Sequence, residues 1–95
     1  MKNIIILPSF ERDLKKLPSV DRGKVVKSLG QFNEFIASGN FSQGLGLKKI
    51  NHDKYEFRVD IRLRIVFKQM GQDIYLVLVG SHDEVKKYLR QYRQK

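Results

Sequence analysis

Strict alternation of apolar and polar residues runs through the segment KYEFRVDIRLRIVFK, from Lys54 to Lys68, and constrains the fold more than any other feature. Between Tyr55 and Phe67 every odd-numbered residue is apolar. Successive side chains of an extended chain point to opposite faces, so this pattern predicts β-structure with one face in a hydrophobic core. The other face carries Arg58, Arg62 and Arg64.

The length of the alternating segment predicts a hairpin rather than one strand, because strands of this length are uncommon. A two-residue loop at 60–61 would pair Val59 with Arg62 and turn an arginine into the core. A three-residue loop at 60–62 instead pairs Val59 with Leu63 and keeps the apolar face intact. We therefore expect the three-residue loop.

This register places Arg58 directly opposite Arg64. Like charges that face each other across two strands destabilise a sheet. The arrangement becomes favourable when an anion lies between them, and the forked donors of arginine suit phosphate. The alternative is a solvated outer face on which Glu56 or Asp60 compensates the arginines.

The N-terminal half of the chain predicts a strand followed by two helices. Residues 3–7 are mostly β-branched and end at Pro8, which is typical of a strand. We expect Ser9 to cap a short helix that stops at Pro18, and Ser19 to cap a longer one. The apolar stripe of the longer helix consists of Val25, Leu29, Phe32 and Ile36.

The longer helix should stop at Gly39-Asn40, followed by a loop over 40–46 and a strand over 47–50. After the alternating segment, residues 74–80 are apolar throughout, which fits a strand buried on both faces. Ser81 and Glu84 form a capping box that opens a last helix. Its inward residues are Val85, Leu89 and Tyr92.

The resulting order is β-α-α-β-β-β-α, with the helices separate from a run of antiparallel strands. This order predicts an α+β domain in which helices cover one face of an antiparallel sheet. The uncovered face would then carry the arginines at the floor of an open concavity.

Charge is the clearest compositional signal. The chain has 19 Lys and Arg against 10 Asp and Glu, a formal net charge of +9. A compact domain with such an excess usually binds a polyanion, most commonly nucleic acid. The alternatives are an acidic protein partner, or a basic protein with no polyanionic partner at all.

Length and cysteine content exclude several classes. The 95 residues suit a single domain over 1–95. The chain has no cysteine, which excludes disulfides, a thiol nucleophile and a thiolate metal site. The first residues contain an apolar run too short for a signal peptide or a membrane span, so we expect a cytoplasmic protein with no membrane partner.

Few side chains offer chemistry. His82 follows the buried strand at the end of the sheet, where imidazole could transfer protons near neutral pH; an ordinary first-turn helix residue is the alternative. Tyr88 could stack on a base or simply pack. His52 falls in a predicted turn, where a solvated role is expected. Further candidates for binding RNA phosphate are Lys48, Lys49, Arg62, Lys86 and Lys87, with Arg90 and Arg93 nearby.

Over essentially its whole length, the chain resembles the RelE/ParE superfamily of small bacterial toxins from type II toxin–antitoxin systems. Three features carry the resemblance. One is the order of elements, and another is YEFRVDIRLRIVF, similar to the family's YRLRVGDYRVIY-type hairpin. The third is LVGSHDEVKKYL, similar to the family's last strand with its GxRxxVY or GxHxxLF ending. The resemblance implies one RelE-like domain, related in fold to the microbial ribonucleases.

The RelE/YafQ-like ribonuclease branch is the favoured relative. Its members enter the ribosomal decoding site and cleave mRNA there, by attack of the 2′-hydroxyl on the adjacent phosphate. The resemblance implies the same translation-inhibiting activity here, with no metal or other cofactor. It implies three partners: the ribosome, mRNA and a cognate antitoxin. The catalytic positions that it assigns are Arg58, Arg64, His82 and Tyr88.

The sequence departs from the family pattern at two positions. Leu63 replaces the usual tyrosine before the arginine, and Glu56 stands where some members are basic, which leaves the number of phosphate-binding cations open. Two other functions stay open. ParE-like proteins share the fold but poison DNA gyrase, and a non-catalytic homologue would act only in an antitoxin or repressor complex. The four filled catalytic positions favour the ribonuclease, because a gyrase poison does not need them.

Overall fold

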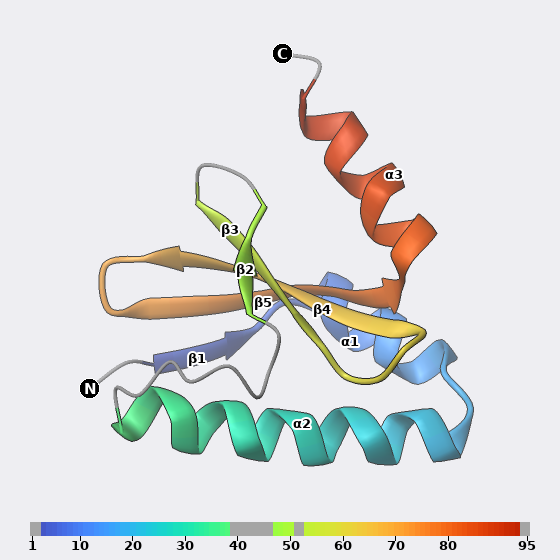
Figure 1. The fold of residues 1–95 in the computed structure, drawn as a ribbon, viewed down its shortest axis with the longest axis horizontal. Coiled ribbons are helices and arrows are strands. Elements are labelled where there is room, and N and C mark those ends of the chain that lie inside the picture. The colour runs from blue at the N-terminus through green and yellow to red at the C-terminus, as the bar shows by residue number, and fades with distance from the viewer. Residues whose placement is uncertain (1–2, 39–46, 51–52, 94–95) are drawn as a thin grey trace.

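The computed structural model describes residues 3–38, 47–50 and 53–93. These form β1 (Asn3–Ile6), α1 (Pro8–Lys16), α2 (Ser19–Ser38), β2 (Lys48–Lys49), β3 (Lys54–Arg58), β4 (Leu63–Met70), β5 (Asp73–Ser81) and α3 (His82–Arg93). The five strands form a sheet in the order β1-β5-β4-β3-β2. In Figure 1, α2 runs along one side of this sheet, and α3 leaves the end of β5 on the other side.

The predicted α+β fold class is confirmed, with two refinements. Four strands rather than three follow the helices, because the predicted order of elements counted the predicted hairpin, now β3 and β4, as one strand. The sheet is also mixed rather than wholly antiparallel, since β1 pairs with β5 in parallel, with Asn3 beside Asp73. The predicted strand over 47–50 is present as β2, which pairs with β3.

The hairpin between β3 and β4 has the predicted register. Arg58 lies opposite Arg64, and the N–H of Val59 donates to the carbonyl of Leu63 at 2.9 Å. The three-residue loop is therefore confirmed. Parity was sufficient to predict it, because any shift by one residue would have moved the whole apolar set out of the core.

Asp60 organises this loop. Its Oδ1 accepts hydrogen bonds from the N–H groups of Arg62 and Leu63 at 2.8 and 2.9 Å, as in an Asx turn. Its Oδ2 accepts a hydrogen bond from Nζ of Lys24 on α2 at 3.0 Å. The N–H of Arg62, followed by the Lys24 ammonium, lowers the pKa of the Asp60 carboxyl below 3.8.

Asp60→Ala is expected to lower the free energy of unfolding by about 1–2 kcal/mol, because two backbone donors lose their acceptor. Asp60→Asn is the matched variant, since it keeps an acceptor oxygen and loses the charge. A carboxyl with a lowered folded pKa stabilises above its unfolded pKa, and this stabilisation is lost as pH falls through the folded value. The wild type should therefore lose its advantage over Asp60→Asn in urea unfolding as pH falls below 3.8. An advantage that persists unchanged into acid would contradict this.

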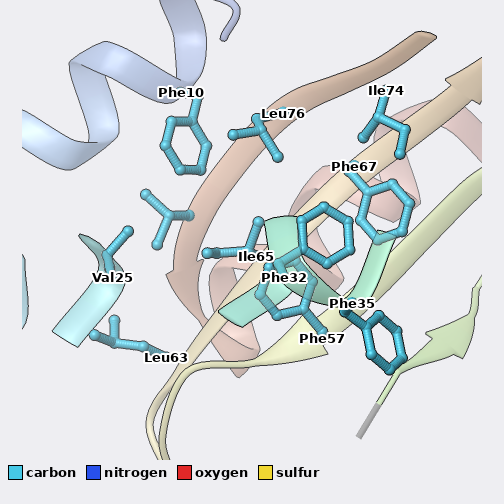
Figure 2. Close-up of a cluster of buried hydrophobic side chains, with 11 residues drawn as sticks. Phe10, Val25, Phe32, Phe35, Phe57, Leu63, Ile65, Phe67, Ile74 and Leu76 are labelled. Atoms are coloured by element: carbon cyan, nitrogen blue, oxygen red, sulfur yellow. The ribbon is translucent and has the colours of Figure 1, made fainter. Parts of the chain in front are cut away.

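The main core lies between the sheet and helices α1 and α2 (Figure 2). At its centre, the ring of Phe32 stacks on that of Phe57 with centroids 4.5 Å apart and contacts Phe67 at 4.9 Å. The buried members are Phe10, Val25, Phe32, Phe35, Phe57, Leu63, Ile65, Phe67, Ile74, Leu76 and Val79. Every other residue of β3 and β4 therefore faces the side of this core, and their charged residues face away from it.

The predicted stripe of α2 is the face that packs on the sheet. Val25 and Phe32 are fully buried, and Leu29 and Ile36 pack against the core from its margin. The stripe missed Phe35, which is 9% exposed. With Phe35 included, the buried face is wide enough to cover a sheet rather than a single neighbouring helix.

Helix α1 covers the half of β5 that β1 leaves unpaired. Oγ of Ser9 donates to the carbonyl of Val77 at 2.7 Å, and the carboxyl of Asp13 accepts the N–H of Val79. Burial raises the pKa of the Asp13 carboxyl above 3.8, although the Val79 N–H acts in the opposite direction. Two side chains of α1 thus satisfy backbone groups that a further strand would otherwise bind.

The predicted caps of the first two helices are wrong. Leu7 is the N-cap of α1 without a side-chain cap, because Pro8, which lacks an N–H, suits the first helical position. Ser9 is therefore already inside the helix, where it binds β5. The carbonyl of Pro18 accepts the first hydrogen bond of α2, so Ser19 is the first helical residue rather than the cap.

Helix α3 packs on the opposite face of the sheet from α1 and α2, which corrects the expectation that the helices share one face. Val85 lies in a second buried cluster with Val66 and Val77. The register of β4 and β5 shifts at Val66/Phe67, which leaves an extra residue in β5. As a result, both Val77 and Leu78 contact the α3 cluster, and β5 is buried on both faces as predicted.

The predicted capping box opens α3. The N–H of Ser81 donates to Oε1 of Glu84 at 2.8 Å, and the N–H of Glu84 donates to Oγ of Ser81 at 3.1 Å. Gly80 leaves room for this carboxylate, because a Cβ there would lie 2.7 Å from Oε1 of Glu84. The box fixes the start of α3 at His82.

Some predictions lie outside the described residues. They are the helix stop at Gly39-Asn40, the loop over 40–46, His52, and the side-chain positions of Tyr92 and Arg93.

Candidate functional site

The face of the sheet that carries α3 also carries the predicted arginine pair. Arg58 of β3 and Arg64 of β4 are cross-strand neighbours, and Phe57 and Ile65 beside them point into the main core. The two arginines therefore lie side by side on the face away from α1 and α2, as the parity of the hairpin predicted. Gly80 of β5 is the next residue in this row.

The two arginines differ in their surroundings. Nη1 of Arg64 lies 3.4 Å from Oε2 of Glu56, and only 18% of the Arg64 side chain and 6% of the Glu56 side chain are exposed. The Nε of Arg64 is buried without a hydrogen-bond partner among the described residues. Arg58 is exposed. Glu56 thus holds Arg64 against the sheet, whereas Arg58 is presented to solvent.

A second like-charged pair lies on the same face, and sequence reasoning missed it. Lys54 is the cross-strand neighbour of Lys68. Oδ1 of Asp53 lies 3.2 Å from Nζ of Lys54, and its Oδ2 lies 3.8 Å from Nζ of Lys68. Although desolvation acts to raise it, the pKa of the Asp53 carboxyl is lowered below 3.8, first by the hydrogen bond from Lys54 and then by the lysine charges. The alternating pattern already contained this signal, because residues 54 and 68 mirror each other about the same turn.

Arg62 does not belong to the arginine face, which corrects its assignment with Arg58 and Arg64. It lies in the hairpin loop, where the alternation of the strands no longer holds. Its Nη2 is 3.6 Å from Oδ1 of Asp21 on α2, and 69% of its side chain is exposed. Such an exposed ion pair contributes little to stability and leaves the guanidinium accessible.

His82 is exposed at the start of α3. It lines a pocket of about 410 Å³ together with Arg62, Asp21 and the first residues of α3. His82 follows Ser81, which pairs with Leu63, the first residue of β4. His82 therefore lies at the same end of the sheet as Arg64, the second residue of β4.

Tyr88 is partly buried and packs against the second hydrophobic cluster, which is the packed alternative that the sequence left open. It also lines a pocket of about 330 Å³ whose other residues are Leu7, Ser9, Asp13, Lys54, Lys68, Val77 and Leu78. Of the four predicted catalytic residues, Arg58 and Arg64 are therefore adjacent, whereas His82 and Tyr88 line two different pockets.

The predicted surface lysines are exposed but are divided between faces. Lys48 is the strand neighbour of Glu56 and lies on the arginine face, whereas Lys49 pairs with Tyr55 on the core side. Lys86 and Lys87 are exposed on α3. A basic field extends over the arginine face from β2 to α3, and Lys49 is not part of it.

Within the described ranges, no three His, Cys, Asp or Glu side chains are grouped so that they could hold a metal ion. None of the helices described here combines the length and the apolar character needed to cross a membrane.

Solved structures with the same architecture include an antitoxin–toxin complex. The chain is similar to the RelB–RelE antitoxin–toxin complex of Methanococcus jannaschii, with a TM-score of 0.66 and 24% identity over 88% of this chain and 96% of that one. It is similar to the DinJ–YafQ complex of E. coli, with a TM-score of 0.68 and 12% identity over 90% and 98%. It is also similar to the YoeB dimer of Staphylococcus aureus, with a TM-score of 0.66 and 20% identity over 85% of this chain and 97% of that one.

The chain is a small basic α+β domain with an open five-stranded sheet. Its fold is that of the RelE-like toxins of type II toxin–antitoxin systems. The sequence itself matches no protein-family model and no curated protein.

Proposed function

We propose that this chain is the toxin of a toxin–antitoxin module and that it cleaves mRNA on the ribosome. The likeness to RelE, YafQ and YoeB supports the toxin part. The observation that carries the ribonuclease part is the cross-strand pair of Arg58 and Arg64. Two arginines held opposite each other on one sheet face make a binding site for a phosphate group.

In the proposed reaction, the ribose 2′-oxygen attacks the adjacent phosphorus, and the bond from phosphorus to the 5′-oxygen breaks. The 2′-hydroxyl loses its proton, and the 5′-oxygen gains one. Arg58 and Arg64 would stabilise the negative charge of the pentacoordinate phosphate. His82 would supply or accept one of the two protons, and Tyr88 would stack on or hydrogen-bond the RNA.

Glu56 has a positioning role in this proposal. Its buried carboxylate holds Nη1 of Arg64 and leaves the exposed Arg58 free to reach the substrate. The sequence left open how many phosphate-binding cations accompany Glu56. Its contact with Arg64 supports a role in which it fixes the orientation of one cation rather than cancelling it.

The cognate antitoxin is the proposed protein partner. The net charge of +9 suits an acidic segment that folds as it binds. Such a segment would cover the arginine face or pack along the helices. The DinJ–YafQ and YoeB–YefM structures are complexes of this kind of fold with a second protein.

The test is to add the purified chain to a translating extract and map the 5′ ends of the mRNA. We expect new ends within translated codons, and none when ribosomes are omitted. Cleavage of free RNA at an equal rate would contradict the ribosome-dependent part. An intact mRNA pool in a cell whose growth is inhibited would contradict the ribonuclease itself.

A second candidate function is the poisoning of DNA gyrase, as in ParE-like proteins. One observation favours it: His82 and Tyr88 line different pockets, and a gyrase poison needs no assembled catalytic set. Accumulation of cleaved DNA–gyrase complexes in the presence of the chain, with intact mRNA, would identify this function.

A further inference from the structure

The Lys54/Lys68 pair repeats the arrangement of the arginine pair farther along the same hairpin. Each lysine lies four residues from an arginine of its own strand, so the two pairs are about 13 Å apart on one face. Like charges opposite each other destabilise a sheet. Each pair is compensated by one carboxylate, from Asp53 or Glu56. A face that holds two such pairs keeps an excess of positive charge along a line.

The pocket beside the lysine pair is lined by chemically different groups. Its cations are Lys54, which is 9% exposed, and Lys68, whose side chain is 36% exposed. Its other lining residues include Tyr88, Leu78 and Asp13. The volume of about 330 Å³ lies within the range of small-molecule sites, about 300–1,000 Å³.

We propose that this pocket binds one nucleotide of the RNA strand, at a step that flanks the phosphate held by Arg58 and Arg64. The two lysines would take a backbone phosphate. The apolar walls would cover the flat face of the base, and the Asp13 carboxyl would accept a hydrogen bond from a base amino group. The inference rests on the proposed function, because it assumes that the strand lies along the arginine face.

The test is the binding of 2′-O-methyl oligoribonucleotides, which lack the attacking hydroxyl, measured by fluorescence anisotropy over a series of salt concentrations. Oligonucleotides of increasing length are compared on wild type and Lys68→Ala. Once the oligonucleotide is long enough to span both cation pairs, the slope of log K against log salt should be shallower for Lys68→Ala by about 0.7, the loss of one phosphate contact. Shorter ones should bind both proteins alike.

Lys27→Ala is the control, because it removes the same charge from an exposed position on α2, across the sheet from the pocket. It should leave the wild-type slope unchanged. If the Lys27→Ala and Lys68→Ala slopes are equal for long oligonucleotides, the pocket makes no phosphate contact and the inference fails. Weaker antitoxin binding by Lys68→Ala, with the wild-type slope on RNA, would also overturn it, since the occupant would then be a protein.

Oligonucleotides in which one nucleotide at a time is replaced by an abasic residue test the base contact. The affinity of the wild-type protein should fall when the abasic residue stands at one position and should change little when it stands at any other. Equal tolerance at every position would overturn the base contact. These binding assays need no ribosome, so they separate this inference from the proposed function. If mRNA cleavage is observed but Lys68→Ala binds the oligonucleotides as the wild type does, the proposed function is supported and the inference about the pocket is rejected.

Discussion

Arg64→Ala is expected to reduce mRNA cleavage by about 10²–10³-fold and to lower the free energy of unfolding by about 3–5 kcal/mol. The first effect follows from the loss of a cation that stabilises the transition state, which typically costs about 10²–10³-fold in rate. The second follows because Glu56, with a side chain only 6% exposed, would be left as a buried carboxylate without its partner. Cleavage mapping in a translating extract and urea unfolding measure the two effects.

The double variant Arg64→Ala/Glu56→Gln separates catalysis from folding. It removes the stranded charge, so it should recover much of the lost stability and none of the cleavage. Arg58→Ala is the companion variant: because Arg58 is exposed, its unfolding free energy should stay within about 0.5 kcal/mol of wild type while RNA binding weakens. If the double variant regains cleavage, Arg64 acts through stability alone.

The register of the β3–β4 hairpin could be predicted from the sequence because one constraint outweighed all others. A shift by one residue would have moved Phe57 and Ile65, both fully buried, to the outer face. The capping box of α3 was predictable for a similar reason, since Ser81 and Glu84 act through bonds local to the chain. Local bonds and strict parity can be read from a sequence without knowing the rest of the fold.

Features that depend on contacts distant in sequence could not be predicted. Ser9 has the residue type of a helix cap, but it binds Val77 across 68 positions of sequence. Arg62 has the same parity as Arg58, but it lies in the loop, and its partner is Asp21 on α2. The residue type of Ser9 fits the predicted helix cap, and that of Arg62 fits the predicted arginine face. What each side chain binds depends on how α1 and α2 pack against the sheet.

The location of α3 had the largest consequence for the candidate site. The sequence predicted an open face, but the extra residue in β5 turns both Val77 and Leu78 toward α3. Helix α3 packs on the arginine face and contributes Tyr88 to the lining of the pocket that contains the lysine pair. A β-bulge has no reliable sequence signature, so this packing could not be foreseen.

His82→Ala is expected to reduce mRNA cleavage by about 10²–10⁴-fold, the usual contribution of a positioned general acid or base. The residue is exposed at the first position of α3. Its replacement should therefore leave the urea unfolding curve and antitoxin binding close to wild type. Rates of mRNA cleavage in the translating extract, together with growth inhibition in cells, measure the effect.

Asp83→Ala is the matched control, because it changes the next exposed residue of the same helical turn, which lines the same pocket. It should retain most of the cleavage. The structure makes the His82 test decisive, since His82 lines a pocket with Arg62 and Asp21 rather than one with Tyr88. For the histidine to act, the scissile nucleotide must extend from the arginine pair toward the hairpin loop. Cleavage by His82→Ala at the wild-type rate would show that it is an ordinary first-turn residue of α3, and the gyrase hypothesis would then be the stronger one.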